Sequence, residues 1–127
     1  RNFVNIMQDL AARGVKPSVV NDQIGRLTFT DTLVRGIKHL LETNAPYGTY
    51  NLTNEGQPTS WAEIAKIVFE KSGKSSSDIQ PVSTAEYFAN KPSAAQRPQQ
   101  STLNLAKIER TGFIPENWHD KLNNLFG

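Results

Sequence analysis

Two arginines stand in polar, loop-forming stretches, where an arginine gains little from packing. Arg97 lies in the stretch KPSAAQRPQQ, and Arg26 lies in NDQIGRLTFT beside Gln23 and Thr28, which offer neutral hydrogen-bonding groups. A guanidinium group can contact a phosphate at two points, and such a contact is stronger than one between neutral groups. The alternative for each arginine is that it binds no ligand and is a solvated charge on the protein surface. The pattern predicts that these four side chains bind an anionic ligand.

The sequence lacks the usual patterns of a catalytic site. No G-x-G-x-x-G follows a strand, so there is no dinucleotide fingerprint. The stretch GKSSS at 73–77 is no phosphate-binding loop, because Val68 stands where that motif needs a glycine. His39 and His119 are far apart, the carboxylates are scattered, and there is no cysteine. We therefore expect no catalytic residue, cofactor site or metal site in this chain.

Composition narrows the choice of partners. The chain has 127 residues, of which 37% are hydrophobic, and 14 basic residues nearly balance 12 acidic ones. The basic residues form no stripe with aromatic residues, which argues against nucleic-acid binding. No apolar run approaches the roughly 18 residues of a membrane span, so no membrane contact is expected. The chain begins with Arg1 and not with methionine, so we expect a piece of a longer, cytoplasmic protein.

Helical spacing of apolar side chains predicts most of the structure. It predicts a helix over 2–13 that ends near Gly14, and a second helix over 31–43 whose apolar side chains are Leu33, Val34, Ile37, Leu40 and Leu41. Ser60 and Glu63 form a capping box that begins a third helix. Its core-facing side chains are expected to be Trp61, Ile64, Ala65, Val68 and Phe69.

The remaining elements are predicted to be short. Strands are expected at 18–20, 49–53 and 79–82, with Pro81 placing the last of them at a sheet edge. One or two helical turns follow at 83–88, then a loop, then a short helix closed at Gly112. A last helix is expected to start at Pro115 and to face inward through Trp118, Leu122, Leu125 and Phe126. About five helices and two or three short strands predict one α/β (α+β-like) lobe over residues 1–127.

The order and spacing of four stretches resemble a known family. They are Asn2-Phe3-Val4, the stretch from Val20 to Thr28, the stretch from Gly48 to Asn51, and Arg97-Pro98 followed by Ser101, Leu103 and Lys107. Together they are similar to the C-terminal portion of dTDP-4-dehydrorhamnose reductases, which belong to the extended short-chain dehydrogenase/reductase superfamily. The resemblance runs from Asn2 to about Trp118. Gly25 is followed by Arg26 and Leu27, where the family has a small residue and a proline, so the role of Arg26 stays open.

The resemblance implies that this chain is the smaller, substrate-binding lobe of a two-lobed enzyme. An N-terminal Rossmann lobe would bind NADH or NADPH and carry the catalytic Tyr-x-x-x-Lys pair, so the chain alone would be inactive. The enzyme would reduce dTDP-4-dehydro-L-rhamnose to dTDP-L-rhamnose. Arg97 would neutralise the diphosphate, with Gln23, Arg26 and Thr28 near the ligand. Family members also form metal-assisted dimers, which implies Mg²⁺ and a homodimer for the longer protein.

Two other interpretations share this fold. The chain could belong to another nucleotide-sugar epimerase or dehydratase, although such enzymes more often carry Arg-Asp-aromatic where DQIGRLT stands here. It could also belong to a non-catalytic regulatory subunit similar to the β subunit of methionine adenosyltransferase. An intact glycine motif and Tyr-x-x-x-Lys pair upstream would favour an enzyme, and their loss would favour the regulator.

Overall fold

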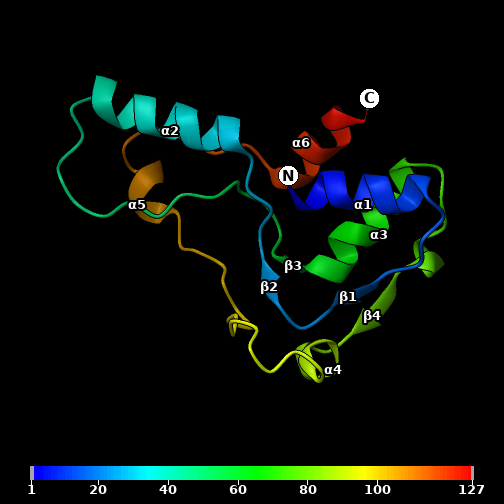
Figure 1. The fold of residues 1–127 in the computed structure, drawn as a ribbon. Helices are drawn as coiled ribbons and strands as arrows, with labels where there is room; N and C mark the ends of the chain where they lie inside the picture. Colours follow the sequence, from blue (N-terminus) through cyan, green and yellow to red (C-terminus); the bar gives the residue numbers. More distant parts are fainter. Residues whose placement is uncertain (1, 127) are drawn as a thin grey trace. The chain divides into compact units, whose positions relative to one another are not determined.

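The chain folds into two compact units in a computed structural model that describes residues 2–126 (Figure 1). Unit 1 takes residues 1–24 and 59–100, and unit 2 takes residues 25–58 and 101–127. Each unit is thus built from two segments that are distant in sequence. That residues 1–127 form one substrate-binding domain stays a prediction.

Unit 1 begins with helix α1 (Phe3–Ala12). The Asn2 side chain caps this helix by accepting a hydrogen bond of 2.9 Å from the backbone N–H of Asn5. The helix is followed by Gly14 with φ of +72°, a left-handed conformation that favours glycine. Both ends of the first predicted helix are confirmed to within a residue or two.

Helix α3 (Trp61–Lys71) is the second long helix of unit 1. Strand β3 (Thr59–Ser60) leads into it, and the Ser60 hydroxyl accepts from the Glu63 N–H at 3.2 Å. The predicted capping box is only half formed, because the Glu63 carboxylate accepts from Lys66 Nζ at 3.0 Å instead. A complete capping box joins Ser83 and Glu86, at the start of the short helix α4 (Thr84–Phe88).

Two short strands complete unit 1. Strands β1 (Ser18–Val20) and β4 (Gln80–Val82) pair in parallel, with Val19 opposite Pro81, and a 3-10 turn η1 (Ser76–Asp78) precedes β4. In a two-stranded sheet each strand has a free edge, which accommodates a proline without an N–H. The apolar faces of α1 and α3 pack together above this sheet. Ala11, Ala65, Val68 and Phe69 are fully buried there.

Unit 2 contains helices α2 (Thr30–Glu42), α5 (Ala106–Glu109) and α6 (Trp118–Leu125). The chain enters it within strand β2 (Ile24–Gly25). Its centre is the fully buried amide of Asn54. Asn54 Oδ1 accepts from Phe29 N–H at 2.7 Å, and Nδ2 donates to Thr32 Oγ1 at 2.9 Å and to the Glu116 carbonyl at 3.0 Å. One side chain therefore joins three segments of the unit.

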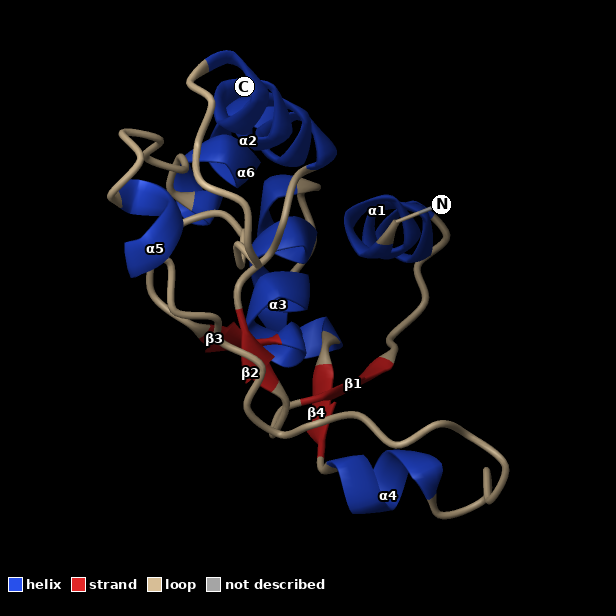
Figure 2. Ribbon diagram, turned by 90° about the vertical axis from the view of Figure 1, so that its left-hand side faces the viewer, coloured by secondary structure: helices blue, strands red, loops and turns tan. Residues whose placement is uncertain are grey.

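Helices and a few short strands, shown in blue and red in Figure 2, confirm the predicted α/β class. Three predictions for unit 2 were wrong. Residues 49–53 form no strand, and the last helix begins at Trp118 after an Asn117 cap, because the buried Pro115 belongs to the preceding loop. Leu125, which was predicted to face inward, is exposed. Much of the apolar face of α2 is exposed as well. Within residues 2–126, no helix has the length and apolar character that crossing a membrane requires.

Candidate ligand-binding site

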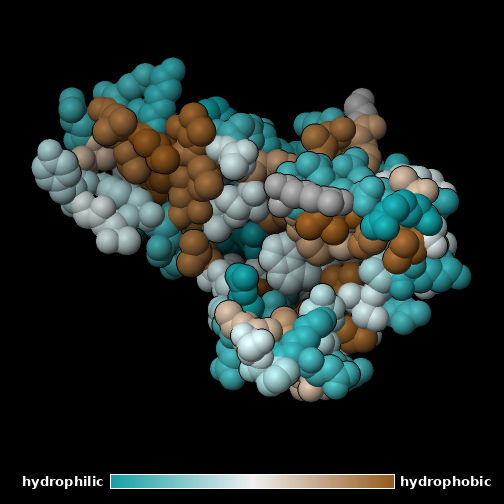
Figure 3. Space-filling model, in the orientation of Figure 1, coloured by the Kyte–Doolittle hydropathy of each residue, from teal (hydrophilic) through white to brown (hydrophobic). Residues whose placement is uncertain are grey.

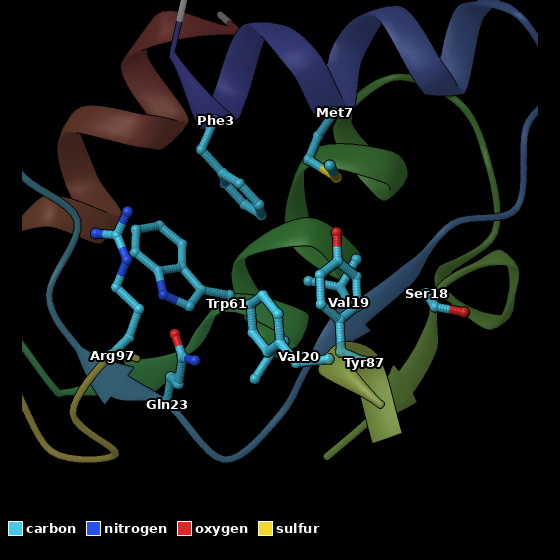
Figure 4. Close-up of a pocket in the computed structure, with 10 residues that line it drawn as sticks. Phe3, Met7, Ser18, Val19, Val20, Gln23, Trp61, Tyr87 and Arg97 are labelled. Carbon is cyan, nitrogen blue, oxygen red and sulfur yellow. The ribbon is translucent and has the colours of Figure 1, made fainter. Parts of the chain in front are cut away.

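Unit 1 contains a pocket of about 370 Å³ with a mostly apolar lining. Four of its lining side chains are aromatic, and Figure 4 labels three of them, Phe3, Trp61 and Tyr87, around one opening. The lining comes from α1, β1, the turn after β1, the start of α3, α4 and the loop that follows α4. Its side chains are Phe3, Met7, Ser18, Val19, Val20, Gln23, Trp61, Tyr87, Phe88 and Arg97. Ligand sites are commonly apolar clefts of this size with a few polar groups.

Trp61 is an exposed pocket residue, which corrects the prediction that it is core. Its side chain is 37% exposed, while Ile64, Ala65 and Val68 on the same helical stripe are buried. The difference arises because Trp61 is the first residue of α3, where the stripe reaches the end of the packed region. The indole packs against Phe3, with ring centroids 4.8 Å apart and a tilt of 57°. A flat aromatic surface is thus held at the pocket with part of its area free.

Arg97 lies at this pocket, and its side chain is exposed. Figure 4 shows its guanidinium group beside the indole of Trp61, with Gln23 below them. Among the described residues, none makes a hydrogen bond or an ion pair with Arg97. A guanidinium that is not occupied by the protein keeps its donors for a ligand.

A second, more polar pocket of about 530 Å³ adjoins the first in unit 1. The two pockets share Phe88 and Arg97 among their lining residues. Lys91 also lines the second pocket, and its ammonium group lies 3.8 Å from the centre of the Tyr87 ring. An apolar space and a polar space, with cations where they meet, suit a ligand that has a flat ring, an anionic linker and a polar end group.

Asp22 and Gln23 hold α4 against the pocket. The Asp22 carboxylate accepts from both the hydroxyl and the backbone N–H of Thr84, the latter at 2.9 Å, and Gln23 Nε2 donates to Thr84 Oγ1 at 3.3 Å. The Thr84 hydroxyl bond is the main reason that the pKa of Asp22 lies below its usual value. Because Thr84 begins α4, these bonds position Tyr87 and Phe88. Gln23 keeps its amide oxygen and one N–H for another partner.

The other two predicted site residues lie in unit 2. Arg26 is largely buried and donates from Nε to the Gly56 carbonyl at 2.7 Å and from Nη1 to the Leu103 carbonyl at 3.0 Å. Its Nη2 lies 3.7 Å from the Glu55 carboxylate. Thr28 is exposed in the same unit. The structure thus brings Gln23 and Arg97 together at one pocket and gives Arg26 structural partners within unit 2.

Sequence reasoning missed the aromatic side of the pocket. The sequence predicts only one or two helical turns at 83–88, which include Tyr87, and it places Phe3 within the first helix without a role in a site. No residue spacing in the sequence indicates that these rings meet, because α1, α3 and α4 are brought together by tertiary packing. The one local indication was the position of Trp61 directly after the Ser60 cap, at the end of a helix.

No group of three or more histidine, aspartate or glutamate side chains within residues 2–126 is placed to hold a metal ion. The residues described here therefore give no ligand set for the Mg²⁺ that the resemblance implies, and no role is assigned to it in this chain.

The whole chain, residues 1–127, matches the family described as the RmlD substrate binding domain. The chain belongs to this family. Spore coat polysaccharide biosynthesis protein SpsK of Bacillus subtilis is 36% identical over 121 residues, which cover 95% of this chain and 40% of SpsK. A dTDP-4-dehydrorhamnose reductase of Aggregatibacter actinomycetemcomitans is 31% identical over 132 residues, or 98% of this chain and 44% of that protein.

Solved structures agree with this assignment. The dTDP-4-dehydrorhamnose reductase of Bacillus anthracis, solved in complex with NADP, has a TM-score of 0.85 and 35% identity, and the match covers 99% of this chain and 43% of that one. A dTDP-glucose 4,6-dehydratase of the same organism has a TM-score of 0.69 at 15% identity, which shows a shared fold alone. The chain thus spans roughly two fifths of the length of the relatives it matches.

Proposed function

We propose that this chain is the nucleotide-sugar-binding part of a cytoplasmic dTDP-4-dehydrorhamnose reductase. The longer protein would transfer a hydride from NADPH or NADH to the 4-keto carbon of dTDP-4-dehydro-L-rhamnose and form dTDP-L-rhamnose. The observation that carries this proposal is Arg97, exposed and unpaired at an aromatic pocket, in a chain that the substrate-binding family matches over its whole length.

The two pockets of unit 1 suit the parts of such a substrate. The thymine ring would stack on the free face of Trp61, where Gln23 offers an amide to the edge of the base. The diphosphate would bind Arg97, with Lys91 adding positive charge. The sugar would occupy the polar pocket that Arg97 also lines. Arg26 and Thr28 stay predicted ligand contacts in unit 2, where Arg26 also donates to two backbone carbonyls.

The cofactor would be bound outside this chain. No dinucleotide fingerprint is present in the sequence, and the chain covers about 43% of the relative that was solved with NADP. We therefore expect the 127-residue chain to be inactive and to bind NADPH no better than background in a calorimetric titration. Stoichiometric micromolar binding would contradict this. The homodimer implied by the resemblance stays a prediction for the longer protein.

The role of Arg97 is tested by steady-state kinetics of Arg97→Ala and Arg97→Lys in the longer protein. A charge-assisted hydrogen bond contributes about 1.5–3 kcal/mol, which is roughly ten- to hundredfold in affinity. Arg97→Ala should raise the KM for the dTDP-sugar by this factor. The KM for the cofactor should stay nearly constant, and kcat should fall less than kcat/KM. Lysine should restore part of the loss, because an ammonium group cannot make the planar two-point contact.

Arg110→Ala is the matched control, since Arg110 is an exposed arginine of unit 2. It should leave both KM values unchanged. If Arg97→Ala behaves like this control, the diphosphate is bound elsewhere and the proposal fails. If the longer protein binds dTDP-sugar through Arg97 but transfers no hydride, the regulatory-subunit interpretation is favoured instead.

A further inference from the structure

Segment 84–99 of unit 1 carries the cations of the site, yet core packing does not hold it. It consists of α4 and the loop after α4, and none of its residues is buried. Figure 3 shows that hydrophilic and neutral side chains prevail where α4 and this loop lie in Figure 1. Residues 85–98 make no hydrogen bond to any described residue outside 83–99. The pocket-lining side chains of the segment include Tyr87, Phe88, Lys91 and Arg97.

The two ends of this segment are bonded to three consecutive residues, 22–24. At the first end, the Asp22 carboxylate accepts from the hydroxyl and the backbone N–H of Thr84. At the other end, the backbone N–H of Ile24 donates to the Gln99 carbonyl at 2.6 Å. Figure 2 shows the loop after α4 returning to β2, which begins with Ile24. The position of the whole segment therefore depends on a few bonds at one place.

Asp22 is the side chain that joins the two ends. Its half-buried carboxylate lines the polar pocket together with Thr84 and Gln99. The Thr84 hydroxyl is the main reason that the pKa of Asp22 lies below its usual value, and the Gln99 side chain lowers it further as a weaker hydrogen-bonding partner. One carboxylate thus contacts the first and the last residue of the segment.

Helix α4 does not need Asp22 in order to form. Ser83 and Glu86 supply a complete capping box, which begins the helix from its own residues. The bonds between Asp22 and Thr84 are additional tertiary contacts, and α4 also packs against β1. Because the helix is capped without them, these bonds determine where α4 lies and not whether it forms.

Prolines stiffen the segment at both of its cations. Lys91 is followed by Pro92, and Arg97 is followed by Pro98. A residue before proline is restricted to an extended backbone. A cation on a stiff backbone that is bonded at both ends loses little freedom when it binds a ligand, which favours affinity.

We propose that Asp22 is a positioning residue of the nucleotide-sugar site, which joins the two ends of segment 84–99 and thereby holds Arg97 at the pocket. Asp22 acts through Arg97 and does not touch the nucleotide. The proposal rests on the proposed function, because that function makes the diphosphate the ligand of Arg97. The competing role is a direct contact, in which the Asp22 carboxylate accepts from a sugar hydroxyl in the polar pocket.

A double-mutant cycle tests whether Asp22 acts through Arg97. Calorimetric titration of the longer protein with dTDP, which has the diphosphate but no sugar, measures the affinity. Asp22→Ala should weaken binding by about tenfold, and in the Arg97→Ala background it should weaken binding by less than about twofold. Equal effects of Asp22→Ala in both backgrounds overturn the proposal. A loss of affinity for dTDP-L-rhamnose without a loss for dTDP also overturns it and favours the direct contact.

The partner of Asp22 provides a second route to the same test. Thr84→Val removes the hydroxyl and should weaken dTDP binding as Asp22→Ala does, whereas Thr84→Ser keeps the hydroxyl and should restore the affinity. Asp78→Asn is the matched control, because Asp78 is a half-buried aspartate of unit 1 that pairs with Lys16 at 3.9 Å. It should leave dTDP affinity unchanged. A loss of affinity in Asp78→Asn as large as that in Asp22→Ala would show a general effect on unit 1 and would overturn the proposal.

Hydrogen–deuterium exchange of the longer protein without ligand tests the anchoring itself. In Asp22→Ala, a peptide that covers residues 84–91 should exchange about tenfold faster, while a peptide from α3 that covers residues 61–71 should not change. Unchanged exchange of residues 84–91 overturns the proposal. Faster exchange of both peptides also overturns it, because the variant then loosens the core of unit 1 as well.

This proposal and the proposed function fail in different ways. If Arg97→Ala weakens dTDP binding and Asp22→Ala does not, the positioning role is wrong and the nucleotide-sugar site stands. If Arg97→Ala leaves dTDP binding unchanged, the nucleotide-sugar site is wrong. The exchange comparison still decides in that case whether Asp22 anchors segment 84–99.

Discussion

Unit 1 and unit 2 differ in how they bury their apolar side chains. Unit 1 has a continuous core between α1, α3 and β1, and it holds most of the buried hydrophobic residues. Unit 2 is organised around the buried amide of Asn54, and it exposes most of the large hydrophobic side chains found at the surface. The difference suggests that a binding pocket needs a self-sufficient core to hold its walls. Unit 2 has fewer buried hydrophobic residues and leaves more of its large apolar side chains exposed.

The largest effect is expected in the core of unit 1. Phe69 is fully buried on α3, and Phe69→Ala should lower the free energy of unfolding by about 3–5 kcal/mol through lost burial and a cavity. Trp61→Ala on the same stripe should cost about 1 kcal/mol, because the indole is already 37% exposed. Urea denaturation followed by circular dichroism measures both.

If Trp61→Ala lowers the free energy of unfolding by more than about 3 kcal/mol, Trp61 is a core residue and its ring offers no exposed face to a ligand. A Phe69→Ala cost below about 1 kcal/mol would contradict the self-sufficient core of unit 1. Calorimetric titration with dTDP is an independent test of the Trp61→Ala variant. The affinity of Trp61→Ala for dTDP should be roughly tenfold lower, because one aromatic contact is lost.

The next largest effect is expected at the centre of unit 2. Asn54→Ala would leave Phe29 N–H, the Thr32 hydroxyl and the Glu116 carbonyl without their partner. Unsatisfied buried groups of this kind should lower the free energy of unfolding by about 3 kcal/mol. Asn51→Ala is a suitable control, because Asn51 is an exposed asparagine in the same segment. An equal, small effect of both variants would show that apolar packing and not the amide organises unit 2.

Local features of the sequence predicted the elements whose determinants are local. The Asn2 cap, Gly14 and apolar spacing define α1, and Ser60 with the spacing after it defines α3. These elements need no knowledge of distant residues, so they could be predicted closely. The start of α6 was missed because two helix-initiating residues compete, and the Asn117 side chain accepts from two backbone N–H groups whereas Pro115 is buried in the loop.

Features that depend on distant partners were predicted less well. Alternation at residues 49–53 indicates a strand, but a strand also needs a hydrogen-bonding neighbour, which no described residue supplies. Anion binding by Arg26 stays a prediction, and the sequence did not indicate that its guanidinium also donates to the carbonyls of Gly56 and Leu103. Residue type shows what a side chain can do, and tertiary contacts decide whether it is free to do it.

A smaller effect concerns acid stability in unit 1. The pKa of Asp22 lies below its usual value of 3.8, chiefly because the Thr84 hydroxyl donates to the carboxylate. The folded state therefore favours the ionised form. The stability from this contact is present above pH 3.8 and is lost as the pH falls through the lowered pKa. Thr84→Val should lower the free energy of unfolding of unit 1 above pH 4. Because the contact is then already absent, this free energy should fall less than in the unchanged chain as the pH is lowered further. Urea denaturation between pH 2 and 5 measures both effects. Equal pH profiles for Thr84→Val and the unchanged chain would contradict this.

The smallest effect is expected in unit 2, where the pH dependence of stability should have the opposite sign to that from Asp22. Glu109 shares a hydrogen bond with Glu55, which raises the pKa of Glu109 above its usual 4.5, and the nearby Arg26 reduces the shift. Because the folded state holds this proton more strongly than the unfolded state, the stability from the pair is present below pH 4.5. It is lost as the pH rises through the raised pKa. Glu109→Gln can still donate to Glu55 but cannot ionise, so its stability should not decline over this range.

This last difference can be measured in a Trp61→Phe background, where the buried Trp118 of unit 2 is the remaining tryptophan. Urea denaturation between pH 4 and 7, followed by tryptophan fluorescence, should give a flatter profile for Glu109→Gln than for the background alone. Glu70→Gln, at an exposed position on α3, should leave the profile unchanged. Parallel profiles for Glu109→Gln and the background would show that the two carboxyl groups do not share a proton. In that case the pH dependence of unit 2 would have to come from its exposed charges, among them the ion pair between Arg35 and Asp31 at 3.7 Å. Because such exposed pairs are screened by salt, raising the ionic strength would then flatten the profile, whereas a proton shared at short range should respond much less.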